Sequence, residues 1–163
     1  MSLNLGSLLA NTTRQYPSET ALIYESKRYS FEYLYSCVRK FAADLKEAGI
    51  ERGDKVAMMI PNVPEFTIVY FGILYAGGVV VSLNILLSAD EVVYHLTHSQ
   101  AKALVMHADC SKIGLEGFER CNTCDVFYFL GDHGSEQAPA NARSFSEALS
   151  RIEHGDICQT MPD

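Results

Sequence analysis

Residues 54–84, DKVAMMIPNVPEFTIVYFGILYAGGVVVSLN, predict a complete strand–helix–strand unit. Its first part, Lys55 to Ile60, is a short apolar run with little alternation, which indicates a strand covered on both faces. Asn62 and Pro64 supply the chemistry of a helix start, because an Asn side chain can accept a free N–H and proline is already fixed at a helical φ. The segment from Phe66 to Ala76 is almost entirely apolar, so we expect this helix to be buried nearly all round.

The end of this helix is marked by Gly77 and Gly78, since glycine turns the chain through positive φ at little cost. A β-branched run, Val79 to Val81, then predicts the second strand, and Leu83 and Asn84 leave the sheet. A βαβ unit of this kind places its two strands parallel and side by side.

The segments before this unit predict a helix, a hairpin and a second helix. Residues Leu5 to Tyr16 have apolar residues at helical spacing and end at Pro17. Ala21 to Tyr24 and Lys27 to Tyr29 read as two short strands joined by a two-residue loop. Ser30 then caps a long helix whose apolar stripe runs from Phe31 to Leu45 and which Gly49 closes.

Beyond the central unit, strands and helices continue to alternate. Ser88 and Glu91 have the spacing of a capping box, and so do Ser144 and Glu147. The predicted helices are Ala89 to His98, Ser111 to Arg120 with Ile113, Leu115 and Phe118 facing inward, and a short one over Phe145 to Ile152. The predicted strands are Ala101 to His107 and Asp125 to Leu130. Residues 131–143 are expected to form an exposed loop, and 153–163 a tail without an element of its own.

This order predicts an α/β protein, with a mostly parallel sheet, helices on both faces and a short antiparallel hairpin near the amino terminus. A length of 163 residues fits one domain with a sizeable core, so we treat 1–163 as a single domain. The longest apolar run, Phe66 to Ala76, is well short of the roughly 18 residues that a membrane-spanning helix needs.

Composition limits the partners. The net charge of −7 and the absence of a run of Lys or Arg argue against a nucleic-acid partner. The amino terminus lacks a basic region followed by a continuous apolar stretch, so it does not resemble a secretory signal. The five cysteines (Cys37, Cys110, Cys121, Cys124 and Cys158) are an odd number without framework spacing, which fits a reducing compartment and predicts a cytoplasmic protein.

One group of residues has the spacing of a structural zinc site. His107 and Cys110 form an H-x2-C pair, and Cys121 and Cys124 form a C-x2-C pair. A predicted strand ends at the first pair and another begins after the second, so the two pairs are expected at opposite ends of the sheet, and thiols without metal are the better interpretation. A thioredoxin-like redox role for the C-x2-C pair is disfavoured, because such pairs open a helix that follows a strand.

Other candidate groups have equally plain structural explanations. His95 and His98 share a helical face and could bind a metal, but His⁺ near a helix C-terminus is the more common reason for such residues. No serine has a G-x-S-x-G setting, and this holds for Ser7, Ser82 and Ser111. The carboxylates are scattered and suggest caps and loop positions: Asp54, Glu65, Asp90, Glu91, Asp109, Glu116 and Glu119.

Phosphate-binding loops are absent from the sequence. It contains neither G-x-x-x-x-G-K-[ST] nor G-x-G-x-x-G, and Gly77-Gly78 leads into a strand rather than a helix. We therefore expect no catalytic, cofactor-binding or metal-binding residue within this chain.

A series of moderate motifs resembles the early part of the adenylate-forming (AMP-binding) enzymes, particularly the acyl-CoA synthetases of the long-chain fatty-acid–CoA ligase type. The motifs are YSFEYL at 29–34, PNVPEF at 61–66, GILYAGGVVVSLN at 72–84 and LLSADEVVYHLTHSQAKALV at 86–105. They cover about the first two-thirds of the chain and occur in the family's order.

The resemblance implies what the whole enzyme would do. A full-length member would join a carboxylic or fatty acid to ATP, with Mg²⁺, to give an acyl-adenylate and pyrophosphate, and would then transfer the acyl group to CoA. The family's phosphate loop, metal-binding Glu segment, hinge and carboxy-terminal lysine lie downstream of the matched motifs, and residues 1–163 contain none of them. The sequence is thus expected to be an amino-terminal fragment, inactive alone, that would bind none of these cofactors tightly.

Two alternatives remain at this stage. The chain could be a stand-alone Rossmann-like binding or interaction module that shares only the architecture. It could also belong to an amino-acid-activating or luciferase-like branch of the same superfamily, because the acid-selecting residues lie downstream. A truncated sheet would in addition expose apolar surface where the missing part docked, which predicts self-association.

Overall fold

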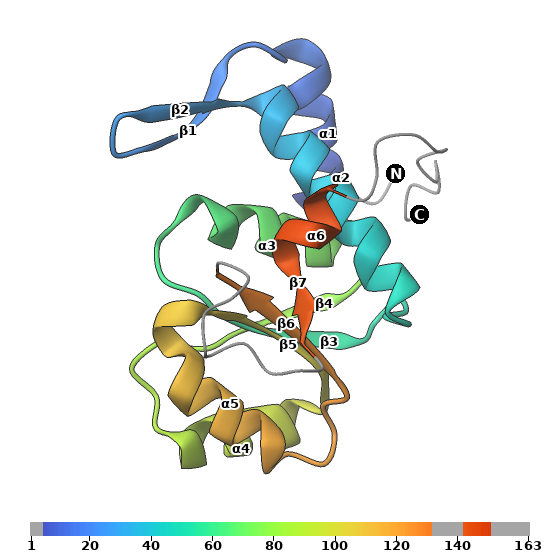
Figure 1. Cartoon of the computed structure of the whole chain (residues 1–163). Helices are drawn as coiled ribbons and strands as arrows, with labels where there is room; N and C mark the ends of the chain where they lie inside the picture. Colours follow the sequence, from blue (N-terminus) through green and yellow to red (C-terminus); the bar gives the residue numbers. More distant parts are fainter. Residues whose placement is uncertain (1–4, 132–141, 151–163) are drawn as a thin grey trace.

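A five-stranded parallel sheet organises the protein (Figure 1). The computed structural model describes residues 5–131 and 142–150. Within them the strand order is β4-β3-β5-β6-β7, and all four neighbouring pairs are parallel. The strands are β3 (Lys55–Met59), β4 (Val79–Ser82), β5 (Ala101–His107), β6 (Val126–Leu130) and β7 (Arg143–Ser144).

Six α-helices and a hairpin accompany this sheet in the described residues. The helices are α1 (Leu5–Gln15), α2 (Phe31–Glu47), α3 (Pro64–Tyr75), α4 (Ala89–Ser99), α5 (Ser111–Glu119) and α6 (Phe145–Ser150), and the hairpin consists of β1 (Thr20–Tyr24) and β2 (Lys27–Ser30). The hairpin is antiparallel and forms a separate sheet that projects from the body beside α2 (Figure 1). The α/β class, the parallel sheet and the hairpin predicted from the sequence are confirmed.

The central unit β3-α3-β4 forms where the sequence predicted it. Pro64 occupies the first turn of α3, and no residue of this helix is more than half-exposed, which agrees with its apolar composition. The N-cap is Val63, without a side-chain cap, so the expected capping role of Asn62 is wrong. Asn62 lies one residue too early to reach the first free amides of the helix. Gly77 follows at φ +89°, the left-handed conformation that ends the helix.

Both predicted long-helix caps form. Ser30 accepts a hydrogen bond from the Tyr33 amide at 3.2 Å at the start of α2. At α4, Ser88 and Glu91 make the reciprocal bonds of a capping box. Ser144 accepts from the Glu147 amide at 3.2 Å ahead of α6. The predicted continuation of that helix to Ile152 lies outside the described residues.

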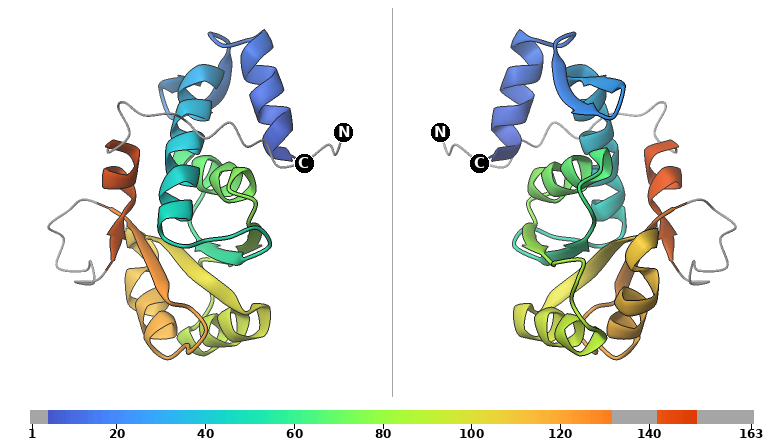
Figure 2. Two further views of the ribbon diagram at one scale, coloured as in Figure 1. Left: turned by 90° about the vertical axis from the view of Figure 1, so that its right-hand side faces the viewer. Right: turned by 90° about the vertical axis from the view of Figure 1, so that its left-hand side faces the viewer.

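Two layers of helices cover the sheet, one on each face (Figure 2). On one face α1, α2, α3 and α6 enclose a core of large side chains around Phe41, Ile73 and Tyr128. On the other face α4 and α5 enclose a second core around Leu96, Leu104 and Met106. The central strands β3 and β5 contribute alternate residues to the two cores, which is why they read as continuous apolar runs.

The orientation of α5 differs from the prediction at Ile113, whereas Phe118 packs against the second core as expected. Its buried residues are Ser111, Gly114 and Gly117, whereas Ile113 is 38% exposed. A Cβ atom on Gly114 would lie 2.0 Å from Met106 Sδ, and one on Gly117 would lie 2.4 Å from Val92 Cγ1. The helix therefore turns its small residues inward, because close approach of its backbone to α4 and β5 leaves no room for Ile113 there.

A fifth strand was missed. The expected exposed loop over 131–143 included Arg143, but Arg143 and Ser144 form β7, which pairs with β6 at Tyr128 and Phe129. Residues 132–141, the rest of that loop, and the tail over 153–163 lie outside the described residues. No helix in the described ranges is long and apolar enough to cross a membrane.

Candidate functional site

The topology of the sheet directs attention to the edge where β3 and β5 end. From β3 the chain crosses through α3 on one face of the sheet to β4, and from β5 it crosses through α5 on the other face to β6. The two connections therefore run in opposite directions along the sheet from the neighbouring strands β3 and β5. In open parallel sheets such a switch point leaves a crevice beyond the carboxyl ends of the strands. Met59 pairs with Met106, so the residues that reach this edge are Ile60 to Asn62 from β3 and His107 to Asp109 from β5.

The titratable pair at this edge is His107 and Asp109. The Asp109 amide donates to His107 Nδ1 at 3.2 Å, and the Asp109 carboxylate lies 3.4 Å from the same nitrogen. The shorter contact makes Nδ1 an acceptor, which leaves the proton of the neutral ring on Nε2. The arrangement caps the short 3₁₀ turn Ala108–Cys110 and places polar groups at this edge of the sheet. Among the described residues, no carboxylate other than that of Asp109 contacts His107.

The residues of the sequence-predicted zinc group do not come together. His107 ends β5, while Cys121 and Cys124 precede β6, and these strands run parallel, so the two pairs lie at opposite ends of the sheet. Helix α5, nine residues long and thus about 13 Å, separates Cys110 from Cys121. No cluster of three or more His, Cys, Asp or Glu side chains that could hold a metal occurs in ranges 5–131 and 142–150.

The two histidines of α4 form an aromatic surface cluster with Tyr94. His98 stacks on Tyr94 with ring centroids 5.4 Å apart, and His95 meets the same ring edge-on at 5.5 Å. His98 lies in the last turn of α4. This is a structural role, and the metal alternative for this pair has no third ligand within the described residues.

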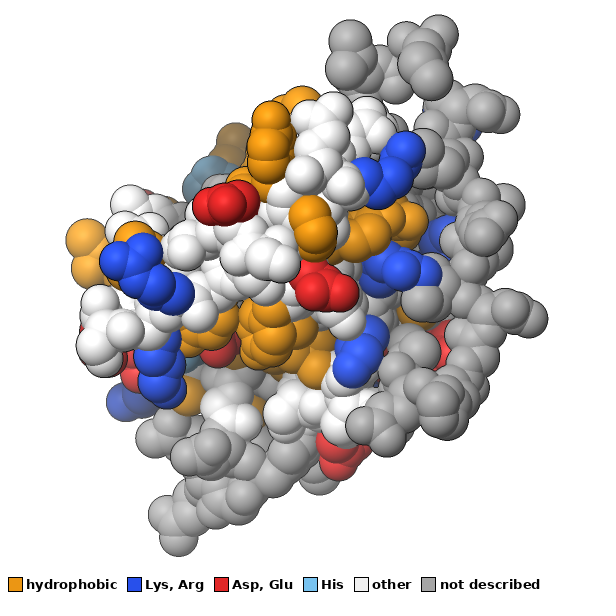
Figure 3. Space-filling model, turned by 90° about the horizontal axis from the view of Figure 1, so that it is seen from above, with side chains coloured by type: hydrophobic (Ala, Val, Ile, Leu, Met, Phe, Trp, Pro, Cys, Tyr) orange, Lys and Arg blue, Asp and Glu red, His pale blue; other side chains and the backbone are white. Residues whose placement is uncertain are grey.

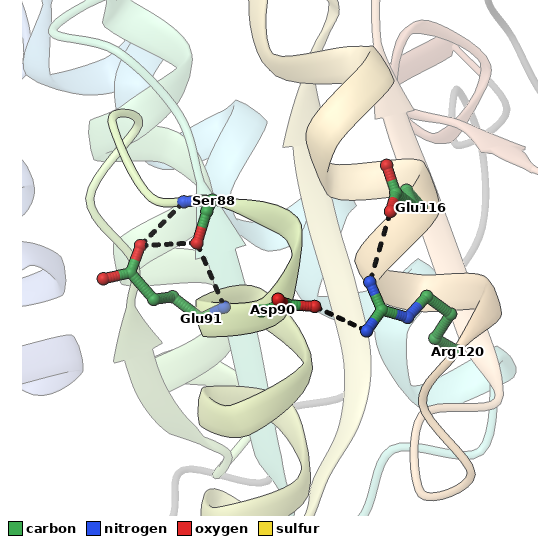
Figure 4. A network of polar contacts seen from close by, with 5 residues as sticks. All are labelled: Ser88, Asp90, Glu91, Glu116 and Arg120. Atoms are coloured by element: carbon green, nitrogen blue, oxygen red, sulfur yellow. Dashed lines mark hydrogen bonds and ion pairs between the residues drawn. The ribbon is translucent and has the colours of Figure 1, made fainter.

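Helix N-termini are the usual phosphate sites, and those of α3 and α4 are blocked or occupied. In α4 the Glu91 carboxylate accepts from the Ser88 amide at 2.8 Å and also from its hydroxyl at 2.8 Å, and these bonds hold the pKa of Glu91 below its usual value (Figure 4). In α3 the first turn contains Pro64, which lacks an N–H, and Glu65, which repels an anion. The first turns of α3 and α4 therefore do not favour an ATP phosphate group.

Sequence reasoning missed a buried polar cluster. The Tyr128 hydroxyl donates to Asp44 Oδ2 at 2.6 Å, and Arg143 donates to the two oxygens of the same carboxylate at 3.1 and 3.0 Å. Asp44 is 4% exposed. Burial and the Asp44 carboxylate together raise the pKa of Tyr128 far above its ordinary value. In the sequence, the one indication of this cluster is that Asp44 stands between the apolar residues Phe41 and Leu45 of α2. Its partners come from β6 and β7, and no local pattern identifies them.

A second ion pair fixes the opposite, amino-terminal end of the sheet. Lys102 Nζ lies 2.9 Å from Asp54 Oδ2 and 2.8 Å from the Gly49 carbonyl oxygen. The Glu51 amide donates to the same Asp54 oxygen at 2.8 Å, and this bond, followed by the one from Lys102, lowers the pKa of Asp54. The cluster ties the turn before β3 to the start of β5.

Comparison with known proteins identifies the class to which this fold belongs. The family described as "AMP-binding enzyme" matches residues 9–157. The long-chain-fatty-acid–CoA ligase of Bacillus subtilis (strain 168) is 36% identical over 101 residues, which cover 62% of this chain and 18% of that protein. The 4-hydroxybutyrate–CoA ligase 2 of Metallosphaera sedula is 36% identical over 98 residues, covering 60% of this chain and 18% of that protein.

The solved structures agree. The coronafacic acid ligase of Pectobacterium brasiliense has a TM-score of 0.83 and 26% identity, and the match covers 91% of this chain and 29% of that protein. The chain belongs to the AMP-binding enzyme family, as its motifs indicated. It spans less than a third of the length of these relatives.

Proposed function

We propose that this chain is the amino-terminal part of an ATP-dependent acyl-CoA synthetase that acts on a fatty acid or a similar carboxylic acid. The observation that carries the proposal is the family match over 9–157 together with 36% identity to a long-chain-fatty-acid–CoA ligase. The motifs behind the resemblance, PNVPEF and GILYAGGVVVSLN, fall on the β3-α3-β4 unit at the centre of the fold. This favours a family member over an unrelated Rossmann-like module.

In the proposed reaction the acid attacks ATP to give an acyl-adenylate and pyrophosphate, with Mg²⁺, and the acyl group then passes to CoA with release of AMP. Such a step requires groups that stabilise the charge developing on the transferred phosphoryl group. The described residues supply no phosphate loop and no metal cluster, so we assign them no catalytic, cofactor-binding or metal-binding residue. Their role in the proposal is to form one α/β layer of the larger catalytic domain.

The acid itself is the finer part of the proposal. Two relatives with the same 36% identity are a long-chain-fatty-acid–CoA ligase and a 4-hydroxybutyrate–CoA ligase, so similarity in this region does not separate a long apolar acid from a short polar one. A fatty acid is favoured because several of the similar ligases carry that name. Amino-acid-activating and luciferase-like activities remain the alternatives, and a cytoplasmic location remains a prediction.

The test is acid-dependent exchange of labelled pyrophosphate into ATP. The product of the whole reading frame is assayed with acids of two to eighteen carbons and with free amino acids, beside the 163-residue chain as the matched control. We expect exchange with a subset of the acids by the longer product and none by the 163-residue chain. Exchange by the short chain would overturn its assignment as non-catalytic, and exchange with amino acids alone would overturn the fatty-acid assignment.

We further propose that the 163-residue chain self-associates through its apolar surface. Large hydrophobic side chains reach the surface on α1, the hairpin and the start of α2, as seen in the view from above (Figure 3); they include Leu5, Leu8, Tyr16, Ile23 and Tyr33. The edge strand β4 adds Val79, 46% exposed, and the loop after it adds Leu86, 85% exposed. Analytical ultracentrifugation should show concentration-dependent dimers; a monomer at high concentration would contradict this proposal.

A further inference from the structure

The C-x2-C pair between α5 and β6 has a structural setting that the zinc hypothesis does not explain and the ligase reaction does not use. Cys121 follows the last turn of α5, where its amide donates to the Phe118 carbonyl at 3.0 Å, and Cys124 stands two residues before β6. Both are free thiols and both are buried, at 8% and 5% exposure. The turn brings two nucleophilic sulfur atoms into one short loop.

The sulfur of Cys121 is surrounded by hydrogen-bond donors. Thr123 Oγ1 lies 3.2 Å from Cys121 Sγ, and Thr97 Oγ1 from the end of α4 lies 3.7 Å from it. Thr123 can donate its single hydroxyl proton either to Cys121 Sγ or to the Leu96 carbonyl oxygen, which lies 3.4 Å from Thr123 Oγ1. A negative charge on the sulfur would favour donation to the sulfur. A sulfur with several donors aimed at it is stabilised as the thiolate.

The two thiols of the pair are therefore unequal. Burial by itself would raise the pKa of Cys121, but the hydrogen bonds from Thr123, Thr97 and the Cys124 amide bring it below the ordinary value. Burial and the neighbouring Cys121 charge raise the pKa of Cys124 to about 12, and its thiol instead donates to the Val126 carbonyl at 3.9 Å. One sulfur is prepared as a nucleophile, and the other stays a neutral thiol beside it.

Cys121 is also close to solvent. Thr97, whose hydroxyl faces the sulfur, is an exposed residue, and so is Asn122 in the turn itself. The other described thiols differ on this point: burial raises the pKa of both Cys37 and Cys110. Cys121 thus lies directly beneath exposed residues, and among these thiols it is the one whose pKa is lowered.

We propose that Cys121 is a peroxide-reactive modification site and that Cys124 is its resolving thiol. In the first step the Cys121 thiolate attacks hydrogen peroxide: an S–O bond forms, the O–O bond breaks, the sulfur is oxidised to a sulfenic acid, and the peroxide is reduced to hydroxide. In the second step Cys124, no longer facing a charged Cys121 sulfur, gives up its proton and attacks that sulfur as the thiolate: the Cys121–Cys124 bond forms, the S–O bond breaks, and the leaving hydroxide takes up the proton as water. The inference is independent of the proposed ligase activity.

Tryptic peptide mapping tests this directly in the unmodified sequence. Cleavage after Arg120 and Arg143 yields peptide 121–143, which holds Cys121 and Cys124 and no other cysteine. Cys110 falls in peptide 103–112 and Cys37 in peptide 29–39, and these serve as internal controls. After brief treatment with hydrogen peroxide and alkylation of the remaining thiols, peptide 121–143 should be two hydrogens lighter than the unalkylated reduced form. Peptides 103–112 and 29–39 should be alkylated in full.

Variants separate the two roles. Cys124→Ser should stop at the sulfenic acid, which dimedone traps on residue 121, and Cys121→Ser should leave Cys124 unmodified. Thr123→Val should slow alkylation of Cys121 by about tenfold, the worth of one hydrogen bond to a charged sulfur. Thr12→Val, a substitution of a partly exposed threonine on α1, is the matched control and should change nothing. Alkylation of Cys110 or Cys37 as fast as that of Cys121, or no disulfide on peptide 121–143, would overturn the proposal.

Discussion

The two faces of the sheet are packed by different means. The face under α2, α3 and α6 is filled by large side chains, with Phe41 against Tyr128 and Phe145 at ring distances of 5.3 and 5.2 Å, and it contains a buried carboxylate. The face under α4 and α5 is closed by glycines that let the backbone approach Met106 and Val92. The first face also has one such close approach, at Gly72 beside Phe41, but it adds a buried polar cluster with long-range partners. The second face depends on Gly114 and Gly117.

The largest effect is expected at the buried carboxylate. Asp44→Ala removes the partner of both Arg143 and Tyr128 and leaves a buried hydroxyl without an acceptor. Loss of one member of a buried charged cluster costs about 3 kcal/mol of the free energy of unfolding, reduced somewhat here because Arg143 can reach water. Urea denaturation measures the change. Glu47→Ala, an exposed residue of the same helix, is the control, and an equal loss there would contradict the argument.

The second effect probes the other face. In Gly117→Ala the new methyl group would meet the branched side chain of Val92, which cannot turn aside as a methionine can. We expect a loss of about 2 kcal/mol from overpacking, partly offset by about 1 kcal/mol of better helix propensity. Gly114→Ala meets the flexible Met106 side chain instead and should cost less. If both substitutions stabilise the protein, close backbone approach does not hold this face together.

A smaller effect concerns the cap of α4. Ser88→Ala removes the hydroxyl that accepts from the Glu91 amide and should cost about 1 kcal/mol. Because α4 packs on the glycine-lined face, the loss should be similar in the wild-type and Asp44→Ala backgrounds. A double-mutant cycle in urea measures this additivity. A coupling larger than about 0.5 kcal/mol would show that the two faces are not independent.

The smallest expected effect is a change in the free energy of unfolding at acid pH. It concerns Asp54, at the amino-terminal end of the sheet. The pKa of Asp54 is lower in the folded protein than in the unfolded chain. Its carboxylate therefore stabilises the fold fully at pH values above its unfolded-state pKa, and this stabilisation is lost as the pH falls through its folded-state pKa. Asp54→Asn should therefore narrow the difference in urea midpoint between pH 7 and acid pH. Asp109→Asn, at the opposite end of the sheet, is the control. An unchanged difference in Asp54→Asn would refute the assignment.

Most of the elements could be predicted from local patterns. The strand Ala101–His107 has the predicted bounds, and the caps at Ser30 and Ser88 form as expected, because each depends on residues no more than a few positions apart. The first of the three failures is local, and the other two involve distant partners. Asn62 is displaced from the cap by one residue, Ile113 is turned outward by the close approach of α5 to Val92 and Met106, and Arg143 is drawn into a strand by Tyr128 and Asp44.

The candidate site shows the same division. The sequence identified the H-x2-C and C-x2-C spacings correctly as patterns, and its geometric argument that a strand and a helix keep them apart is supported by the parallel pairing of β5 and β6. The sequence did not identify the donors around Cys121, because Thr97 lies 24 positions away on another helix. Only the packing of α4 against the turn brings that hydroxyl to the sulfur.

The sequence by itself determined the alternation of strands and helices, the apolar β3-α3-β4 unit and the family, because periodicity, capping and motif order are properties of neighbouring residues. The tertiary structure decided which face of α5 is buried, where the buried carboxylate finds its partners and which cysteine is surrounded by donors. These depend on groups far apart in the chain, and their free energies are settled only when desolvation and close packing bring those groups together.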